Sequence, residues 1–298
     1  MRLITRADLD GLTCALFVTA CEPIDSIELV HPQEMTDRKL SINANDIIAN
    51  LPYHPACRKW FDNHLLTDEG LTPRKGFEGR YGSAPSAARM TYEYYAPRHP
   101  ELKKYEAMLL EVDRFDSAQL SGEDVTNPAG YVLLGYTLDP RTGLGAFREY
   151  FAILLEALRT KPIEELLQLA PVAERVARMH EQDGSFRELT VASSMLLGNV
   201  VRTDFRGLPQ LPVGNRFLVY SLFPEANVSL RLAWGPRREA VVVNVGWSIF
   251  NRTCKTNLGV LMSLYGGGGH RGAGSCMLPR ETADAQARQI VDALRSKD

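Results

Sequence analysis

The first half of the chain alternates short apolar runs with segments that have helical spacing. The apolar runs are typical of strands and lie at residues 1–5, 26–32, 46–53 and 59–65. Residues 12–21 and 83–96 have the spacing of helices, and residues 103–118 fit either a helix or a strand that ends in acids. Strands that alternate with helices predict βαβ units and a parallel sheet.

The pattern changes after Gly184. Residues 148–159 and 162–182 have helical spacing, whereas the following segments are rich in strand-forming residues, at 196–208, 216–224, 227–234 and 239–250. Two more helices are expected at 257–265 and 283–297. We therefore predict an α/β chain in which residues 1–185 form a parallel-sheet domain with a helical connector, and residues 190–298 form a smaller α+β domain.

Composition narrows the classes of protein that the chain can represent. Of 298 residues, 45% are hydrophobic and 23% are charged, which is ordinary for a folded globular protein. The net charge of -2 gives no overall basic field, so any anion site must be local. There is no apolar run long enough to cross a membrane, and the start of the chain does not have the pattern of a signal peptide. Five scattered cysteines without a CxxC pair favour reduced thiols and a cytoplasmic location.

Acidic residues follow several of the expected strands. Asp8 and Asp10 come after the first strand, and in an extended segment residues two apart project to the same side. Two adjacent carboxylates repel each other unless a cation lies between them, and magnesium or manganese is such a cation. The same D-x-D-G pattern also suits a surface turn, so taken alone it leaves both interpretations open.

Other acids lie at the ends of later runs. Asp62 and His64 end residues 59–65, and Asp113 and Asp116 end residues 103–118. A parallel sheet delivers the ends of its strands to one edge, where two metal ions could polarise a phosphate and activate a water. The residues predict a metal-assisted phosphoryl site, with solvated loop acids as the alternative.

Six glycines surround one histidine between Gly266 and Gly274. Ordering a glycine costs roughly 0.5–1 kcal/mol more backbone entropy than ordering an alanine. An ordered run of glycines is therefore expected to have a structural or functional role. Backbone N–H groups without a Cβ can approach an anion closely, and His270 can donate a hydrogen bond to a phosphate oxygen. A flexible linker is the alternative, although the run leads directly into the apolar segment 275–278.

The order of these motifs resembles the DHH phosphoesterase family. The resemblance rests on D-x-D-G at the start, F-D-N-H near residue 60, a later V-D, and YGGGGHRGAG near the end. Within the family the chain is similar to bacterial exopolyphosphatase-related and nanoRNase-like two-domain proteins. The resemblance implies a ligand cleft between the domains and cleavage of polyphosphate, pyrophosphate, short oligonucleotides, cyclic dinucleotides or single-stranded DNA with Mn²⁺ or Mg²⁺.

The resemblance also implies roles for individual residues, although the metal centre departs from the family pattern. The implied metal ligands are Asp8, Asp10, Asp113, Asn50 and Asn63. Asn50 stands where the family has a bridging aspartate, with Asp46 as a lower-ranked alternative. Asn63 stands where the DHH motif has its first histidine. Fewer imidazole ligands favour one hard ion over a manganese pair.

Substrate-facing roles follow from the same resemblance. His64 and Asp62 are the implied catalytic pair. The implied phosphate ligands are Arg252, Lys255, His270 and the backbone of Gly267, Gly268 and Gly269. We expect a metal-dependent hydrolase of a small phosphorylated substrate, with short single-stranded RNA or DNA as a further candidate, no membrane partner, and a homodimer as one open assembly. The alternative is a catalytically weakened protein that binds a phosphorylated ligand.

Three further patterns have plainer interpretations. His54 and Cys57 could belong to a zinc site, but a loop is the favoured interpretation. Asp116 is expected to cap a following helix. The aromatic run at 92–96 is expected to pack a helix onto the sheet.

Overall fold

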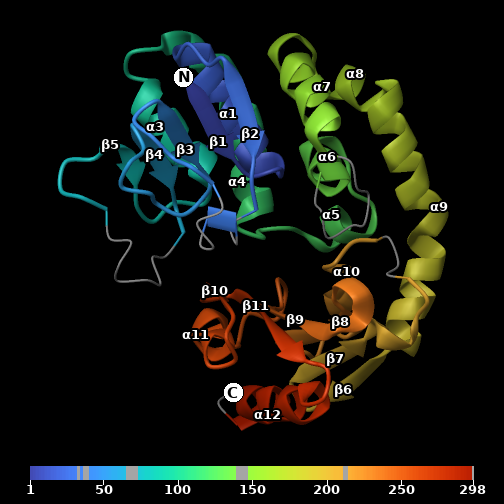
Figure 1. The fold of residues 1–298 in the computed structure, drawn as a ribbon. Coiled ribbons are helices and arrows are strands. Elements are labelled where there is room, and N and C mark those ends of the chain that lie inside the picture. Colours follow the sequence, from blue (N-terminus) through green and yellow to red (C-terminus); the bar gives the residue numbers. More distant parts are fainter. Residues whose placement is uncertain (32–33, 36–39, 65–72, 139–146, 211–213, 297–298) are drawn as a thin grey trace. The chain divides into compact units, whose positions relative to one another are not determined.

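The computed structural model describes residues 1–31, 34–35, 40–64, 73–138, 147–210 and 214–296 (Figure 1). The chain folds as two compact units. Unit 1 comprises Met1–Leu120 and Asn127–Ala177, and unit 2 comprises Ser121–Thr126 and Arg178–Asp298. The region 183–192, where the sequence pattern changes, lies inside one long helix, α9 (Ala170–Ala192).

Unit 1 is built on a five-stranded parallel sheet, which confirms the predicted α/β class. The strands are β1 (Arg2–Thr5), β2 (Ser26–Leu29), β3 (Asp46–Ala49), β4 (Lys59–Asp62) and β5 (Glu78–Tyr81). They lie in the order β2-β1-β3-β4-β5, and each neighbouring pair is parallel. The carboxyl ends of all five strands therefore meet at one edge of the sheet.

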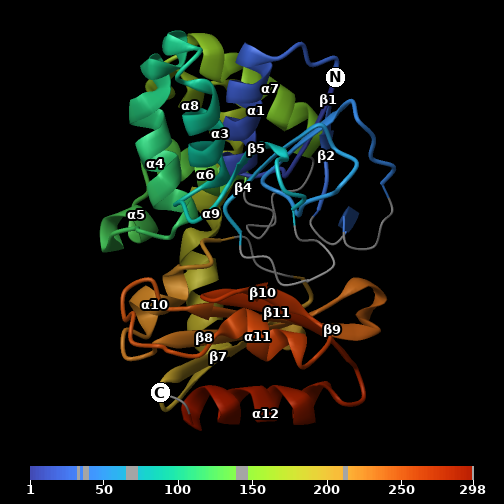
Figure 2. The same cartoon turned by 90° about the vertical axis from the view of Figure 1, so that its left-hand side faces the viewer.

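Helices cover one face of this sheet (Figure 2). They are α1 (Leu9–Cys21), α3 (Ala87–Tyr95), the 3₁₀ helix η2 (Pro100–Tyr105), α4 (Glu106–Asp116), α6 (Gly130–Leu138), α7 (Phe147–Thr160) and α8 (Ile163–Leu167). Helices α1 and α3 contact the strands directly. Helix α1 is apolar on every side and almost wholly buried, as expected of a helix enclosed by a sheet and other helices.

The other face of the sheet has its own apolar core. Ile4, Ile48 and Trp60 project from the three central strands into this core, and Tyr53 and Phe77 pack on the indole of Trp60. The β-branched and aromatic composition of these strands suits residues that are buried on both faces.

Unit 2 is built on a six-stranded mixed sheet. Its strands are β6 (Ser194–Leu197), β7 (Val200–Asp204), β8 (Val228–Trp234), β9 (Ala240–Trp247), β10 (Gly268–His270) and β11 (Ala273–Pro279), in the order β10-β11-β9-β8-β7-β6. Only the β7–β8 pair is parallel among these described strands.

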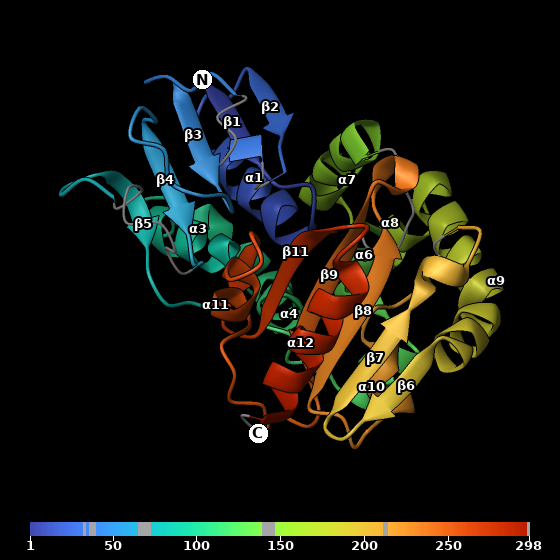
Figure 3. The ribbon, with the colours of Figure 1, turned by 60° about the horizontal axis from the view of Figure 1, so that its bottom comes forward.

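Two helices, α11 (Leu258–Ser263) and α12 (Ala283–Ser296), close the apolar face of this sheet (Figure 3). The remaining short elements of unit 2 are α5 (Gly122–Thr126), α10 (Leu218–Leu222) and the 3₁₀ turns η4 (Phe205–Gly207) and η5 (Pro236–Arg238). Residues 216–224 were expected to be a strand, but residues 218–222 within this range form α10. Its apolar residues Leu218, Val219 and Tyr220 are consecutive and buried, a run that does not distinguish a strand from one buried helical turn.

Two expectations about the acidic residues were wrong in their local structure. Residues 106–116 form helix α4, so Asp113 and Asp116 do not end a strand. Asp8 and Asp10 do not share an extended segment either, because Asp8 is the N-cap of α1 and Asp10 lies in its first turn.

The described helices include none that is both long enough and apolar enough to span a membrane. All five cysteines lie within the described residues and are free thiols.

Candidate active site

Asp8 is held at the turn between β1 and α1. Its Oδ1 accepts hydrogen bonds from the backbone N–H of Gly11 and from Nδ2 of Asn50, both at 2.9 Å. The turn is tight, since a Cβ on Gly11 would lie 2.0 Å from the carbonyl oxygen of Arg6. The Nε of Arg6 lies 2.9 Å from the other oxygen of Asp8. An arginine therefore forms an ion pair with the first acid of the D-x-D-G motif.

Asp10 is buried against the start of α3. Its two carboxylate oxygens accept hydrogen bonds from the backbone N–H groups of Ala88 and Ala87, at 2.7 and 3.0 Å. These are free N–H groups of a helix N-terminus, which favours a negative charge. Burial nevertheless raises the pKa of Asp10 well above its ordinary value, and the carboxylates of Asp116 and Asp8 raise it further. A cation beside Asp10 would lower this pKa, because it stabilises the ionised carboxylate.

Asp113 lies on α4 beside the same helix start. Ser86, the N-cap of α3, donates a hydrogen bond from Oγ to Asp113 at 2.6 Å. Arg89 binds the second oxygen of Asp113 through Nε at 2.9 Å and also through Nη2. Asp10 and Asp113 are thus both anchored on residues 86–89, although they come from different helices. Arg89 was not singled out from the sequence, where it is one of many basic residues.

Asp62 and His64 form a close pair at the carboxyl end of β4. Asp62 is only 1% exposed, and its Oδ1 lies 2.5 Å from Nδ1 of His64. Burial alone would lower the pKa of His64, but the carboxylate of Asp62, helped by Asp116 and Asp10, raises it to about 9. The imidazole is therefore protonated at neutral pH and presents a positive charge beside the acids.

The two asparagines at predicted metal positions have different surroundings. Asn50 has a positive φ of 56°, a conformation that asparagine tolerates better than most residues, and it donates its amide to Asp8. Asn63 donates its amide to the carbonyl oxygen of Ala84 at 3.0 Å. The Oδ1 of Asn63 is buried and has no hydrogen-bond partner among the described residues. A buried oxygen without a partner is costly unless another group binds it.

We call Asp8, Asp10, Asp62, His64 and Asp116 the acidic cluster. Asp8 and Asp116 raise the pKa of Asp10, whereas Asp62, Asp116 and Asp10 raise that of His64, and all five residues belong to unit 1.

The expectation that Asp116 caps a following helix was wrong. Asp116 ends α4, with Ser117 as the C-cap. The carboxylate of Asp116 acts on both Asp10 and His64. Its spacing of three residues from Asp113 places both acids on one side of α4, but it does not indicate the influence on Asp10 or His64.

The donor set of the acidic cluster partly suits a divalent cation. Carboxylate and amide oxygens are ligands that Mg²⁺ and Mn²⁺ accept, and the free oxygen of Asn63 and the desolvated carboxylate of Asp10 fit such an ion. Asp113 fits less well, because Arg89 already neutralises it. Within the described residues, no group of three or more His, Cys, Asp and Glu side chains is arranged as a metal site.

Asp46, the lower-ranked alternative, is at the opposite end of β3. It binds Arg2 through two hydrogen bonds of 2.9 and 2.7 Å, and it is buried. Asp46 therefore forms a structural ion pair with Arg2 at the amino-terminal edge of the sheet. His54 and Cys57 lie at that edge too, in a hydrogen-bonded turn, and burial raises the pKa of the Cys57 thiol to about 11.

In unit 2, the glycine run forms the turn after α11 and strand β10. Two of its glycines are required by close packing, since a Cβ on Gly267 would lie 2.0 Å from the carbonyl oxygen of Ser275, and one on Gly269 would lie 2.3 Å from that of Ala273. Gly268 differs, because the space around its Cβ position is open. The fold therefore explains most of the run, but it does not explain Gly268.

Basic residues surround the β10–β11 turn. The backbone N–H of Leu258 bonds to the carbonyl oxygen of Arg271, which ties the loop that carries Arg252 and Lys255 to this turn. Arg252 and Lys255 are exposed, and Nε of Arg252 donates to the carbonyl oxygen of Ile249 at 3.0 Å. The backbone of His270 pairs with Ala273, and its side chain lies outside the described part of the structure. Arg271, which was not predicted as a site residue from the sequence, is exposed beside His270.

The chain has solved structural relatives. No family model and no curated protein sequence matches it. It is similar to the pGpG-specific phosphodiesterase PggH from Vibrio cholerae, with 35% identity, a TM-score of 0.79, and coverage of 100% of this chain and 99% of that one.

Two more distant structures share the fold. RecJ from Thermus thermophilus in complex with Mn²⁺ is 14% identical, with a TM-score of 0.61, over 100% of this chain and 52% of that one. The DHH domain of a protein described as a member of a family of ribosomal proteins is also 14% identical, with a TM-score of 0.57, over 100% of this chain and 87% of that one.

Proposed function

Because the chain belongs to the DHH phosphoesterase family, whose members hydrolyse phosphoric esters, we propose that it is a divalent-metal-dependent phosphodiesterase that cleaves a short 5′-phosphorylated oligonucleotide. The observation that carries the proposal is the 35% identity, over nearly the whole length of both chains, with a pGpG-specific phosphodiesterase. A linear dinucleotide is therefore the first candidate substrate.

The acidic cluster is the proposed centre of the reaction. Asp8, Asp10, Asp62 and the amide oxygen of Asn63 would hold a divalent cation, which supplies charge neutralisation at the scissile phosphate and activation of a water. The short contact between Asp62 and His64 supports a role for His64 as a positioned cation that faces a phosphate oxygen.

The residues of unit 2 that were predicted to bind phosphate stay a proposal for that unit by itself. Exposed Arg252 and Lys255 offer positive charge, and the open space at Gly268 leaves its backbone accessible to an anion. Guanidinium groups suit phosphate because they donate two parallel hydrogen bonds. His270, whose side chain is outside the described residues, stays a predicted phosphate ligand.

A substrate panel tests the proposal. The purified chain is incubated with pGpG, pApA, inorganic polyphosphate, pyrophosphate and a single-stranded DNA oligomer, each with Mn²⁺, with Mg²⁺ or with EDTA. We expect mononucleotide release from a dinucleotide with one of the metals and none with EDTA. Cleavage of polyphosphate alone would contradict the proposed substrate class, and cleavage in EDTA would contradict the metal requirement.

A second candidate function has a specific observation in its favour. Arginines form ion pairs with two of the three aspartates that match the family's metal ligands, Arg6 with Asp8 and Arg89 with Asp113. Fixed positive charges of this kind weaken cation binding. On this basis the chain would bind a phosphorylated ligand as a regulatory module with little turnover.

Product release, measured beside ligand-induced stabilisation, separates the two functions. A protein that only binds raises its melting temperature when ligand is present, but releases no product. We expect pGpG to raise the melting temperature under both functions, so product release with Mn²⁺ decides between them. An Asp10→Ala variant that keeps the stabilisation and loses product release would support the hydrolase.

A further inference from the structure

One face of the unit 2 sheet points away from helices α11 and α12. The helices cover the face that carries Val243 and Cys276, which belong to the apolar core of the unit. The registers place Ser275, Asn244 and Arg231 on the other face, where Asn244 pairs with Ser275 of β11 and with Arg231 of β8. Paired residues of neighbouring strands project to the same side of a sheet. We call these three residues the polar row.

The polar row starts beside the glycine run. Gly268 of β10 pairs with Ser275, so it lies next to the row on the same face. It is also the glycine whose Cβ position is open. Asn244 lies two strands away from Gly268, which is about 10 Å at the ordinary spacing of strands. The predicted phosphate-binding turn therefore leads onto the polar row.

The polar side chains at the open end of the row are available to a ligand. Ser275 is exposed and Asn244 is half-buried. Among the described residues, none forms a hydrogen bond with the side-chain amide of Asn244 or with the hydroxyl of Ser275. The amide of Asn244 can therefore offer both a donor and an acceptor to a polar group placed on this face.

Helix α10 limits the row at its other end. The Tyr220 hydroxyl of this helix donates to the carbonyl oxygen of Gly246 at 2.9 Å and lies 2.8 Å from Oγ of Ser229. Burial raises the pKa of Tyr220, whereas Ser229 and the positive charge of Arg231 act against this rise. The guanidinium of Arg231 therefore lies near the Tyr220 hydroxyl, at the covered end of the row.

Two apolar side chains lie beside the row. Met277 is 58% exposed and pairs with Val242, which shares the face of Asn244 because the two are two residues apart on β9. The ends of the Met277 and Val242 side chains are both 3.6 Å from the Cβ position of Gly235, so they lie side by side. A thioether packs well against an aromatic ring. The face thus combines polar groups with an apolar surface for a planar ring.

The charge of this face suits an anionic ligand. Among the described strand residues that the registers place on it, none is acidic, and Arg231 is permanently charged. Exposed Arg252 and Lys255 lie on the loop that is tied to the β10–β11 turn. A phosphate beside Gly268 would therefore meet positive charge.

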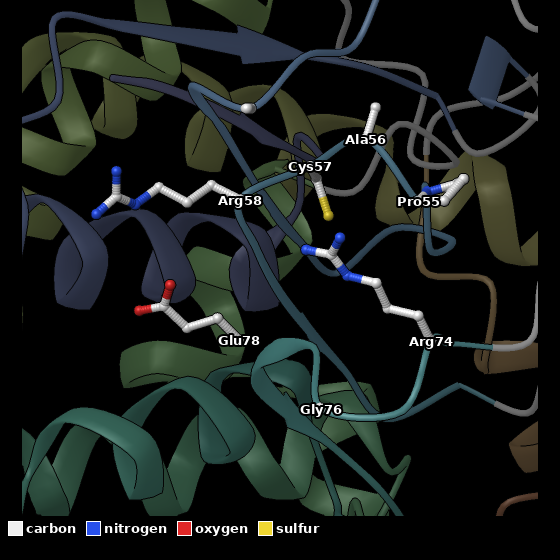
Figure 4. Close-up of a pocket in the computed structure, with 8 residues that line it drawn as sticks. Pro55, Ala56, Cys57, Arg58, Arg74, Gly76 and Glu78 are labelled. Atoms are coloured by element: carbon white, nitrogen blue, oxygen red, sulfur yellow. The ribbon is translucent and has the colours of Figure 1, made fainter.

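The pocket at the amino-terminal edge of the unit 1 sheet differs from this face. It has a volume of about 640 Å³ and contains two arginines (Figure 4). The side chain of Arg58 extends away from Arg74 and toward Glu78, so the two guanidinium groups do not converge on one ligand. The polar row of unit 2 is better suited to a single ligand, because its side chains project from adjacent strands on one face.

We propose that unit 2 by itself binds a guanine nucleotide, with the phosphate at the glycine turn and the base on the polar row. The inference rests on the proposed function, since it takes the glycine turn as the phosphate end of the ligand. Guanine presents two acceptors, O6 and N7, that match the donors of Arg231, and it carries N–H donors for the amide oxygen of Asn244. Adenine has an amino donor in place of O6, which leaves a guanidinium donor unmatched. Asn244 and Arg231 are thus the specificity residues for the base.

The test measures binding by isothermal titration of the full chain in EDTA, with guanosine 5′-monophosphate (GMP), adenosine 5′-monophosphate (AMP) and inorganic phosphate as probes. The variant is Asn244→Ala, at a side chain without a described hydrogen-bond partner, and thermal melting checks that it folds. Gln289→Ala, at an exposed amide of α12 on the other side of the sheet, is the matched control. Asp8→Ala reports on binding at the acidic cluster.

We expect the unmodified chain to bind GMP about tenfold more tightly than AMP, a preference typical of matched hydrogen bonds to one base. Asn244→Ala should remove most of this preference and leave the affinity for inorganic phosphate unchanged, whereas Gln289→Ala should leave the binding of all three probes unchanged.

Three results would overturn the inference: equal binding of the two nucleotides or no binding of GMP to the unmodified chain, an unchanged preference in Asn244→Ala, or loss of nucleotide binding in Asp8→Ala but not in Asn244→Ala. Hydrolysis of pGpG is measured on the same proteins. Absence of hydrolysis together with GMP binding that depends on Asn244 would contradict the proposed hydrolase and support the nucleotide site of unit 2.

Discussion

The guanidinium of Arg89 binds one carboxylate oxygen of Asp113 through two of its nitrogens, on the first turn of α3. Arg6 also forms an ion pair with an aspartate, through its Nε and Asp8. The positive charges of these arginines stand beside carboxylates that match metal ligands of the family. A cation bound at the proposed site would therefore compete with these arginines for the same oxygens.

Arg6→Gln is expected to tighten Mn²⁺ binding by about tenfold, because the substitution removes a positive charge 2.9 Å from Asp8. Isothermal titration with Mn²⁺ measures the change, and Arg288→Gln on α12 controls for loss of a distant surface charge. A weaker or unchanged Mn²⁺ affinity in Arg6→Gln would show that Asp8 does not take part in metal binding.

The sequence was sufficient to predict the α/β fold class. Alternating apolar runs and helical segments predicted the parallel sheet of unit 1, because strands buried on both faces have a continuous apolar composition. The main failure, residues 216–224, concerns a run that is too short for its periodicity to distinguish a strand from a helix. Local pattern determines element type well only where a segment is long or clearly amphipathic.

The partners of the site residues were harder to predict. Asp8, Asp10 and Asp62 were proposed as site residues because of their positions after expected strands. Their environments depend on contacts between residues far apart in the chain, such as Asp10 with Ala87 and Ala88, 77 and 78 residues away. The influence of Asp116 on Asp10 has the same origin. Spacing along one chain segment contains no information about such contacts.

Asp10→Ala is expected to lower the rate of dinucleotide hydrolysis by more than about 100-fold, since it removes a desolvated carboxylate from the acidic cluster. The substitution also removes both acceptors at the start of α3, so Asp10→Asn, which keeps one, separates loss of charge from loss of the cap. Product release is measured at saturating Mn²⁺, with Asp292→Ala on α12 as a control. Full activity in Asp10→Ala would show that the acidic cluster is not the centre of the reaction.

The pair of Arg2 and Asp46 predicts how stability depends on pH. Burial alone would raise the pKa of Asp46, but hydrogen bonds from Arg2 and from the N–H of Asn43 lower it below its ordinary value. A carboxyl whose pKa is lower in the folded state stabilises the fold above its unfolded-state pKa, and this contribution is lost as pH falls through the folded-state pKa.

Asp46→Asn should therefore cost about 1–3 kcal/mol of unfolding free energy at pH 7, and less at pH 3. Urea unfolding of the unmodified chain and the variant at pH 7, 5, 4 and 3 measures the difference. Asp292→Asn, at an exposed position, is expected to change the unfolding free energy little at any of these values. A difference for Asp46→Asn that stays constant or grows toward pH 3 would refute the assigned ion pair.

The glycine run provides a test that separates packing from ligand binding. Gly269 has a φ of 148° and its Cβ would lie 2.3 Å from the Ala273 carbonyl oxygen, so Gly269→Ala should destabilise unit 2 by more than about 2 kcal/mol. Gly268→Ala places its Cβ in open space and should leave the melting temperature within about 2 °C. If the Gly268 backbone approaches the phosphate of a substrate, the same methyl group should raise KM several-fold with little change in kcat. An unchanged KM in Gly268→Ala would show that the ligand does not approach this backbone, and that packing accounts for the rest of the run.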